Sequence, residues 1–271
     1  MSVQLALFAR PLVLGRTKTR LAAVLGAERA LSLYAAFLED TVERMLTLRA
    51  QLPEVELVLC CAEAEPGNAL RERAERWGLP IRSQVGEALG ARMTHALSEG
   101  ISERGAALVV GTDAPTLPLS VLRAACVSLV GDTGSPPNVA HLSRARDGSS
   151  RDELGAGTAG LQRPASGLHL PELCFVPVAD GGYVVVGARG APPSFEDVRM
   201  GTRHALADTL RVNAGRAHVR LPPWYDVDRP ADLRLLRLHV RLDPRVAPHT
   251  AAQLADMEAP GRPPTDRGGA W

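Results

Sequence analysis

One short loop of the chain concentrates positive charge beside hydroxyl groups. Residues 15–20 read GRTKTR, which places three cations and two hydroxyls within six residues. Phosphate groups bind to such a loop because glycine exposes backbone N–H groups and cationic side chains add charge-assisted hydrogen bonds. The loop is not a Walker A motif, since G-x-x-x-x-G-K-[ST] is absent, and a solvated basic turn could have the same composition. The candidate phosphate-binding residues are Gly15, Arg16, Lys18 and Arg20.

Lys18 is unusual in the composition of the whole chain. The sequence contains 31 lysines and arginines, and Lys18 is the only lysine. An ammonium group is a compact charge with rotatable donors, whereas a guanidinium is a rigid planar fork, so the two are not interchangeable in a tight phosphate site. A single lysine inside a candidate phosphate loop favours a functional role for that residue over a solvated turn.

Two further segments carry carboxylates that could bind a divalent cation. Asp113 lies in GTDAP, directly after the apolar run AALVVG, and Asp226 and Asp228 lie in WYDVDRP. Mg²⁺ and Mn²⁺ take oxygen ligands and bridge to substrate phosphates. Each segment also has a plainer interpretation: Asp113 could form a turn or cap a helix, and Asp228 could cap the helix that begins at Pro230.

A fourth motif, ADGGY at residues 179–183, contains a double glycine. The glycines would let the backbone approach a ligand closely, and Asp180 or Tyr183 could hydrogen-bond to sugar or phosphate oxygens. An ordinary Asp-Gly turn is the alternative. The candidates for an acceptor or sugar pocket are therefore Asp180, Gly181, Gly182 and Tyr183.

Apolar runs alternate with amphipathic segments along the chain, and these elements must position the four motifs. The expected strands cover residues 3–9, 55–61, 81–84, 106–111, 174–178, 183–188 and 217–221. The expected helices cover residues 27–49, 68–77, 88–103, 118–130, 202–212 and 230–240. Such alternation of apolar strands and amphipathic helices predicts an α/β fold of three α/β/α layers with a mostly parallel sheet. Ligands of these sheets bind beyond the carboxyl ends of the strands.

We expect a single nucleotide-binding domain over residues 1–242. Within it, residues 131–170 are rich in Gly, Ser, Pro and Arg and show no sustained period, which predicts a surface insertion. Residues 243–271 are rich in Pro, Gly and Arg and are interpreted as a loosely ordered C-terminal tail.

Composition argues against several classes of function. The formal net charge is +1, so neither nucleic acid nor an anionic membrane is an expected partner. No apolar run approaches the roughly 20 residues that span a bilayer, and the N-terminus has no signal-peptide pattern, so a cytoplasmic location is the default expectation. The four cysteines lack zinc spacing, and the seven histidines form no catalytic pattern.

The motifs, taken in order, resemble a known family. They read LALFARPLVLGRTKTRL, VGEALGARM, GTDAP, ADGGYVVVG and LPPWYDVDRPADL. This order resembles the DUF2064 family of GT-A-fold proteins, which are glycosyltransferase-like or nucleotide-diphospho-sugar transferase-like, and more distantly the GT-A nucleotidyltransferases. The resemblance covers most of residues 3–240 apart from the insertion, and it implies a GT-A, Rossmann-like fold. The chain departs from the family in GEALGARM, where GDLGERM is usual, in Ala179, where an acid is usual, and in its longer insertion.

The resemblance also implies roles for the candidate residues. The nucleotide would contact the first loop and the end of the fourth strand, through Phe8, Ala9, Arg10, Gly15, Arg16, Lys18, Arg20 and Thr112. A Mg²⁺ or Mn²⁺ ion would bind to Asp113 and to Asp228 or, as the weaker choice, Asp226. Residues 180–183 would line the acceptor pocket. Lys18 and Asp113 would be catalytic: Lys18 would stabilise the negative charge that develops on the leaving group, and Asp113 would hold the metal ion that neutralises it.

Three functions remain open at this point. The leading hypothesis is a metal-dependent transferase, a glycosyltransferase that uses a nucleotide-sugar donor and a small-molecule acceptor. The first alternative is a nucleotidyltransferase that joins an NTP to a phosphorylated small molecule and releases pyrophosphate. The cationic loop favours this alternative, because an NTP carries more negative charge, whereas the family resemblance favours the first. The second alternative is a nucleotide-binding protein without catalysis.

Overall fold

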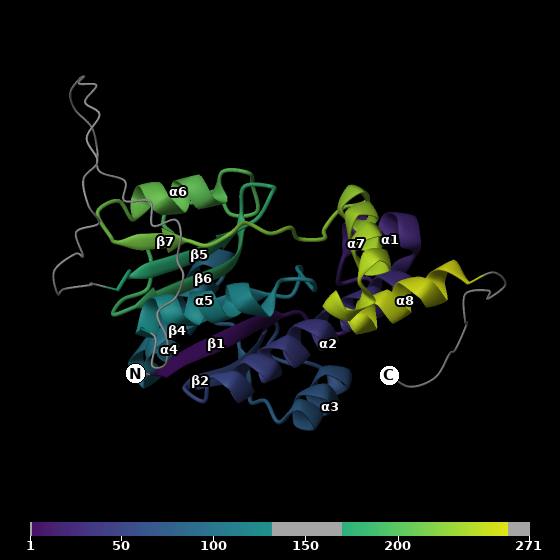
Figure 1. The fold of residues 1–271 in the computed structure, drawn as a ribbon, viewed down its shortest axis with the longest axis horizontal. Helices are drawn as coiled ribbons and strands as arrows, with labels where there is room; N and C mark the ends of the chain where they lie inside the picture. The colour runs from purple at the N-terminus through teal and green to yellow at the C-terminus, as the bar shows by residue number, and fades with distance from the viewer. Residues whose placement is uncertain (1, 132–169, 260–271) are drawn as a thin grey trace, which may run out of the picture.

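The computed structural model describes residues 2–131 and 170–259. Its centre is a seven-stranded sheet with the order β3-β2-β1-β4-β6-β5-β7 (Figure 1). The strands are β1 (Ser2–Ala9), β2 (Val55–Cys61), β3 (Ile81–Ser83), β4 (Gly105–Gly111), β5 (Leu173–Pro177), β6 (Tyr183–Arg189) and β7 (His218–Arg220). All pairings among the described strands are parallel except those of β6 with β4 and β5. The expectation of a mostly parallel sheet is confirmed.

Helices cover both faces of this sheet, which confirms the three-layer α/β/α fold. The helices are α1 (Thr19–Leu25), α2 (Ala27–Gln51), α3 (Asn68–Trp77), α4 (Leu89–Arg104), α5 (Leu119–Val130), α6 (Ala205–Val212), α7 (Pro230–Leu242), the 3-10 turn η1 (Pro244–Val246) and α8 (Pro248–Glu258). Residues of α2, α3 and α5 share one hydrophobic core with the sheet. Those of α4 and α6 pack against the opposite face in a second core.

The alternation of side chains along β1 and β2 produces these two cores. Leu5 and Leu7 point into the core shared with α2, whereas Ala6 points into the other. Adjacent Cys60 and Cys61 divide between the two cores in the same way, as expected for neighbouring residues of a strand. Because both faces are buried, these strands are mostly apolar, with Gln4 and Glu56 as the polar residues inside them.

A third core joins the C-terminal helices to the start of α2. Leu21 of α1, Phe37 of α2, Leu236 of α7 and Leu254 of α8 are all buried together. Figure 1 shows α1, α7 and α8 grouped beyond one end of the sheet, beside α2. The expected loose tail is therefore wrong for residues 244–258, which form η1 and α8; residues 260–271 lie outside the described part of the chain.

The composition of this tail concealed a helix with one apolar face. Ala247, Leu254 and their neighbours Ala251 and Met257 contact the third core, at a spacing close to the helical period. The surrounding prolines fit because Pro248 begins α8, where a missing N–H has no cost. The predicted insertion lies almost wholly outside the described residues, since only positions 131 and 170 at its ends are described.

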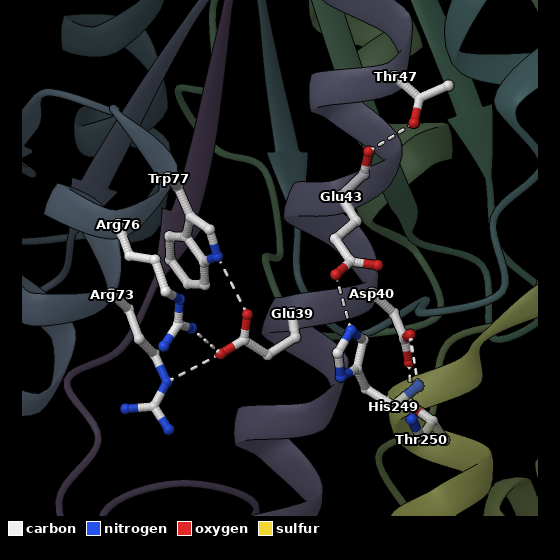
Figure 2. A network of polar contacts seen from close by, with 9 residues as sticks. All are labelled: Glu39, Asp40, Glu43, Thr47, Arg73, Arg76, Trp77, His249 and Thr250. Carbon is white, nitrogen blue, oxygen red and sulfur yellow. Dashed lines mark hydrogen bonds and ion pairs between the residues drawn. The ribbon is translucent and has the colours of Figure 1, made fainter.

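The acidic residues of α2 hold helices on both of its sides. Asp40 accepts hydrogen bonds from the backbone N–H groups of His249 and Thr250, each at 2.9 Å, and so caps the start of α8. The neighbouring Glu39 accepts from the Trp77 indole at 3.0 Å and from Arg76 at 2.6 Å, which fixes α3. Figure 2 shows these two groups of contacts on opposite sides of α2.

Element boundaries differ little from the expectations, with one corrected cap. Thr202 is not the N-cap of α6, because the helix begins at Ala205 after His204. The Thr202 hydroxyl instead accepts from the His204 backbone N–H at 3.2 Å in the preceding turn. No helix among the described residues combines the length and the apolar character needed to cross a bilayer.

Replacing Asp40 with alanine should loosen the C-terminal helices. The Asp40→Ala variant leaves two N–H groups at the start of α8 without their acceptor, one of them on the buried Thr250. We expect the free energy of unfolding to fall by roughly 1–3 kcal/mol, as measured by urea denaturation. Glu43→Ala is the matched control, because its exposed contact with His249 should contribute less than about 1 kcal/mol. Equal losses in both variants would contradict the capping role.

Candidate functional site

The loops that carry the sequence motifs meet at one edge of the sheet. Strands β1, β4, β5 and β7 end at this edge, and antiparallel β6 begins there. The edge therefore gathers four segments: residues 10–18, 112–118, 178–182 and 221–229. Open α/β sheets bind their ligands at this position, so the topology places all four motifs where a ligand is expected.

Lys18 forms the centre of the site. Its ammonium nitrogen lies 2.6 Å from Asp113 Oδ1, 2.9 Å from Asp228 Oδ1 and 2.6 Å from the carbonyl oxygen of Val227. An ammonium has three donors, so each is used by one of these oxygens. The Lys18 side chain is 4% exposed, while those of Asp113 and Asp228 are 42% and 40% exposed.

The two carboxylates keep this buried ammonium charged. Burial by itself lowers the pKa of Lys18, but the ion pairs with Asp113 and Asp228 outweigh it and leave the pKa above the ordinary 10.5. A buried cation is costly unless it is paired and hydrogen-bonded. Removing either partner should therefore cost more than an exposed ion pair would.

The backbone around Lys18 is shaped to present its side chain. Lys18 has φ 47° and ψ 43°, the left-handed conformation, immediately before α1. A non-glycine residue in this region costs about 1 kcal/mol and persists only where its surroundings require it. The Val227 N–H donates to the Asp113 carbonyl at 2.8 Å, so the two loops that bear the carboxylates are bonded to each other as well as to Lys18.

The helix-capping roles considered for Asp113 and Asp228 do not hold, although Asp113 does lie in the bend after β4. Helix α7 has Arg229 as its N-cap, and the carboxylate that accepts from the first N–H groups belongs to Asp232, at 2.7 Å from Arg229 N and 3.1 Å from Asp228 N. Helix α5 begins only at Leu119, with no side-chain cap. Neither Asp113 nor Asp228 caps a helix, so both carboxylates are available to Lys18 and to a ligand.

Asp226 belongs to the same group of acids. Its pKa is raised to about 6, first by burial and then by the negative charges of Asp180, Asp228 and Asp113. Three other carboxylates therefore lie close enough to Asp226 to raise its pKa, and Lys18 is paired with two of them. Such a concentration of negative charge is unfavourable without a counter-ion beyond Lys18.

The ADGGY motif forms an Asp-Gly turn, which the sequence left open as the alternative to a ligand site. Asp180 Oδ1 accepts from the Gly182 N–H at 2.9 Å. Gly181 has φ 93°, and a Cβ atom there would lie 2.1 Å from the Arg203 carbonyl oxygen, so its close backbone approach is to the protein itself. The Tyr183 hydroxyl lies 3.4 Å from the Thr209 hydroxyl of α6, and burial raises its pKa to about 12. The structure thus gives Gly181 and Tyr183 packing roles.

The arginines in and around the first loop differ in whether an ion pair already neutralises them. Arg16 is paired with Glu63 at 3.0 Å. The exposed side chains of Arg10 and Arg20 form no ion pair with any residue of the described ranges. Gly15 is exposed with φ 74°, Ala9 is buried, and the partly buried Phe8 packs against the second core. Within the described ranges, Arg10 and Arg20 are therefore exposed cations without an ion-pair partner.

Tyr34 is a site residue that the sequence did not reveal. It lies on the buried face of α2, and its hydroxyl accepts from Arg10 N–H at 2.7 Å. Burial raises the pKa of Tyr34 to about 12. Hydrogen bonds with the Thr112 side chain and the Arg10 backbone act in the opposite direction and lower it, but by less. Thr112 itself is buried. Tyr34 thereby links the loops after β1 and β4; the only signal in the sequence was a polar hydroxyl at an apolar position of the helix.

Asp113 and Asp228 could hold a divalent cation only if a bound substrate supplied further oxygen ligands, such as phosphate oxygens. Within the described ranges, no group of three or more His, Cys, Asp or Glu side chains is placed to hold a metal ion. Asp113 and Asp228 each use Oδ1 on Lys18, and no hydrogen bond to either Oδ2 forms among these residues. Mg²⁺ commonly binds to one or two carboxylates together with substrate phosphates and water. Two exposed oxygens fit that arrangement.

Comparisons with known proteins bear on the family and the fold. Residues 45–148 match the DUF2064 family, described as an uncharacterized protein conserved in bacteria, and this range contains the motifs VGEALGARM and GTDAP. No curated protein matches the chain. Among solved structures, the chain is similar to a candidate nucleotide-diphospho-sugar transferase from Desulfovibrio desulfuricans G20, with 23% identity over 94% of this chain and 95% of that one and a TM-score of 0.68.

A second solved structure is more distant. A cytidylyltransferase from Leptospira borgpetersenii serovar Hardjo-bovis (strain JB197) is 12% identical over 91% of this chain and 97% of that one, with a TM-score of 0.48. The D. desulfuricans structure shows the fold, which is GT-A-like as expected.

The raised pKa of Asp226 has a measurable consequence for stability. Because the folded state holds this proton more tightly than the unfolded chain, the contribution of Asp226 is complete below its ordinary pKa of 3.8 and is lost as the pH rises through about 6. From about pH 4 to about pH 7, the free energy of unfolding of the wild type should therefore fall relative to that of Asp226→Asn. Asp180→Asn should lower the pKa of Asp226 in an NMR titration. A pKa at the ordinary value would contradict the proximity of the four acids.

Proposed function

We propose that this DUF2064-like chain of GT-A-like fold is a divalent-metal-dependent transferase that uses a nucleotide-activated donor. The observation that carries the proposal is the ion-paired group of Lys18, Asp113 and Asp228 at the carboxyl edge of the sheet. It combines a fixed pair of carboxylates with exposed arginines nearby. This combination suits a diphosphate that arrives with Mg²⁺ or Mn²⁺.

Lys18 acts in this proposal as the residue that positions the two carboxylates. Its three donors are used by Asp113, Asp228 and the Val227 carbonyl, so none remains for the direct phosphate contact that the sequence suggested. By neutralising part of their charge, Lys18 lets Asp113 and Asp228 lie side by side without repulsion. The direct phosphate contacts are assigned to Arg10 and Arg20, whose side chains form no ion pair within the described residues.

The chain's own residues would stabilise the departing group. A bound divalent cation would supply positive charge to the diphosphate. Arg10 and Arg20 would add charge-assisted hydrogen bonds as negative charge develops on the leaving oxygen. The loops are already fixed by the bond from Val227 N–H to the Asp113 carbonyl, so little reorganisation is needed at that moment. Transfers of this kind depend on positioning and charge rather than on a covalent nucleophile.

We assign the donor as a nucleotide sugar and the acceptor as a small molecule. In this reaction the bond between the sugar carbon and the phosphate oxygen breaks, and the nucleoside diphosphate leaves with the bonding electron pair. The acceptor hydroxyl oxygen bonds to that carbon, and its proton passes to water. Asp180 at the β5–β6 turn lies at the rim where an acceptor would enter, since it contributes to the charge around Asp226. The acceptor site is assigned to this turn through Asp180 and Gly182 rather than through Tyr183.

Nucleotidyl transfer is the second candidate, and the free cations of the first loop favour it. An NTP carries more negative charge than a nucleotide sugar, and Arg10 and Arg20 are available to meet it. Release of pyrophosphate from NTPs and sugar phosphates would identify nucleotidyl transfer. Release of a nucleoside diphosphate from a nucleotide sugar would identify glycosyl transfer. Absence of both, with nucleotide binding retained, would indicate a binding protein without catalysis.

The role of Lys18 is tested by two substitutions. Lys18→Ala should weaken binding of nucleotide with Mg²⁺ by about tenfold or more, because Asp113 and Asp228 would repel each other. Lys18→Arg should weaken it less, since the charge is kept but a rigid fork replaces the compact ammonium. Binding is read from the rise in melting temperature with nucleotides and nucleotide sugars, with and without the cation.

Arg29→Ala is the matched control, because Arg29 is exposed on α2. It should bind like the wild type. The melting temperature without nucleotide separates lost binding from lost stability. Wild-type affinity in Lys18→Ala, or binding that EDTA does not change, would refute the proposed site.

A further inference from the structure

A partly open cavity is lined in part by the two loops that also carry Asp113 and Asp228. It has a volume of about 220 Å³, and its lining residues come from α2, the loop between β4 and α5, the start of α5, the segment after β7, α7 and η1. Its lining includes Arg44, Thr116, Trp224 and His239. Thr116 follows Asp113 by three residues, and Trp224 precedes Asp228 by four. The walls of this cavity and the carboxylate site therefore share two loops.

Arg44 brings a positive charge to this cavity without a matching negative one. Its guanidinium donates to the Pro115 carbonyl at 2.5 Å and to the Val246 carbonyl. Burial lowers its pKa, and Asp40 offsets this only in part. No carboxylate of the described residues pairs with Arg44, and only two of its five N–H donors are used in hydrogen bonds there. A half-buried guanidinium with unused donors favours an anion as its partner.

Aromatic rings form the wall beside Arg44. The Trp224 and Tyr225 rings are stacked with centroids 5.8 Å apart, and the His239 ring lies 6.0 Å from that of Trp224. The rings are held in place, since Trp224 Nε1 donates to the Thr116 hydroxyl at 3.0 Å and the Tyr225 hydroxyl lies 2.7 Å from His239 Nδ1. Small-molecule sites commonly combine such apolar walls with a few fixed polar groups.

We infer that this cavity binds a small molecule that carries one anionic group on a flat, apolar body. The anionic group would contact the free donors of Arg44, and the body would lie against Trp224. The volume is below the range of roughly 300–1,000 Å³ for drug-sized ligands, so a single ring with one carboxylate is the appropriate size. The inference does not depend on the proposed transferase function, because it rests on none of the residues of the carboxylate site.

Benzoate and its neutral isostere benzamide test the inference on the full chain. The two share size and ring, so a difference in their binding reports the guanidinium charge. Binding is followed by the indole N–H signal of Trp224, which a Trp224→Phe spectrum distinguishes from those of the other two tryptophans. We expect benzoate to shift this signal with a Kd at least about tenfold lower than that of benzamide.

Two variants locate the site. Arg44→Gln should remove the preference for benzoate over benzamide, whereas Arg49→Gln, a change of the same type on α2 outside the cavity lining, should preserve it. If Arg44→Gln is unstable, because it loses its contacts with Pro115 and Val246, Leu119→Trp serves instead. It fills the cavity, leaves the guanidinium in place and should abolish the benzoate shift.

Three results would overturn the inference. The first is equal binding of benzoate and benzamide, which would show that the charge of Arg44 is not used. The second is an unchanged benzoate shift in folded Arg44→Gln or Leu119→Trp. The third is displacement of benzoate from the wild-type chain by a nucleotide with Mg²⁺ in direct competition, which would place benzoate in the carboxylate site instead.

Discussion

The buried ammonium of Lys18 is the interaction on which the rest of the candidate site depends. It lies between Asp113 of the β4 loop, Asp228 of the segment before α7, and the Val227 carbonyl. A buried lysine is tolerated only when its charge is balanced and its donors are used. The three loops must therefore meet within hydrogen-bond distance, and the left-handed backbone at Lys18 and the Val227–Asp113 bond are the means by which they do so.

Segments from both ends of the chain position the residues that contact Lys18. The parallel strands bring the loops after β1 and β4 to one edge, and Tyr34 of α2 links them through Arg10. The C-terminal helices are held on α2 by the third core and by Asp40 at the start of α8. Because α7 follows Asp228 directly, the attachment of α7 and α8 also fixes the second carboxylate. Regions remote from the ligand edge thereby set the geometry of the site.

Much of this organisation could be read from the sequence, because it depends on local periodicity. The seven strands and most helices follow from apolar runs and helical spacing, and the unique lysine indicates the loop that meets Asp113 and Asp228. What the sequence could not reveal are partners far apart in the chain. Lys18 and Asp228 are separated by 210 residues, so the lysine was assigned to phosphate rather than to carboxylates. The same reason hides Tyr34, whose partners Arg10 and Thr112 lie in other segments.

The composition of two segments did not reveal the contacts that a few of their residues make. Residues 243–271 as a whole are rich in Pro, Gly and Arg, yet Leu254, with Ala251 and Met257, packs one face of α8 against the third core. The double glycine of ADGGY suggested ligand approach, but the backbone that Gly181 meets is that of Arg203. Both findings depend on tertiary contacts that local patterns do not encode.

Anomalous scattering from Mn²⁺, in crystals grown with a nucleotide, tests the central account most directly. The account predicts one Mn²⁺ bound to the Oδ2 atoms of Asp113 and Asp228 and to phosphate oxygens, with Lys18 still paired to both carboxylates. A nucleotide bound at this edge without Mn²⁺ between the two carboxylates, or with Lys18 moved onto the phosphates, would contradict it.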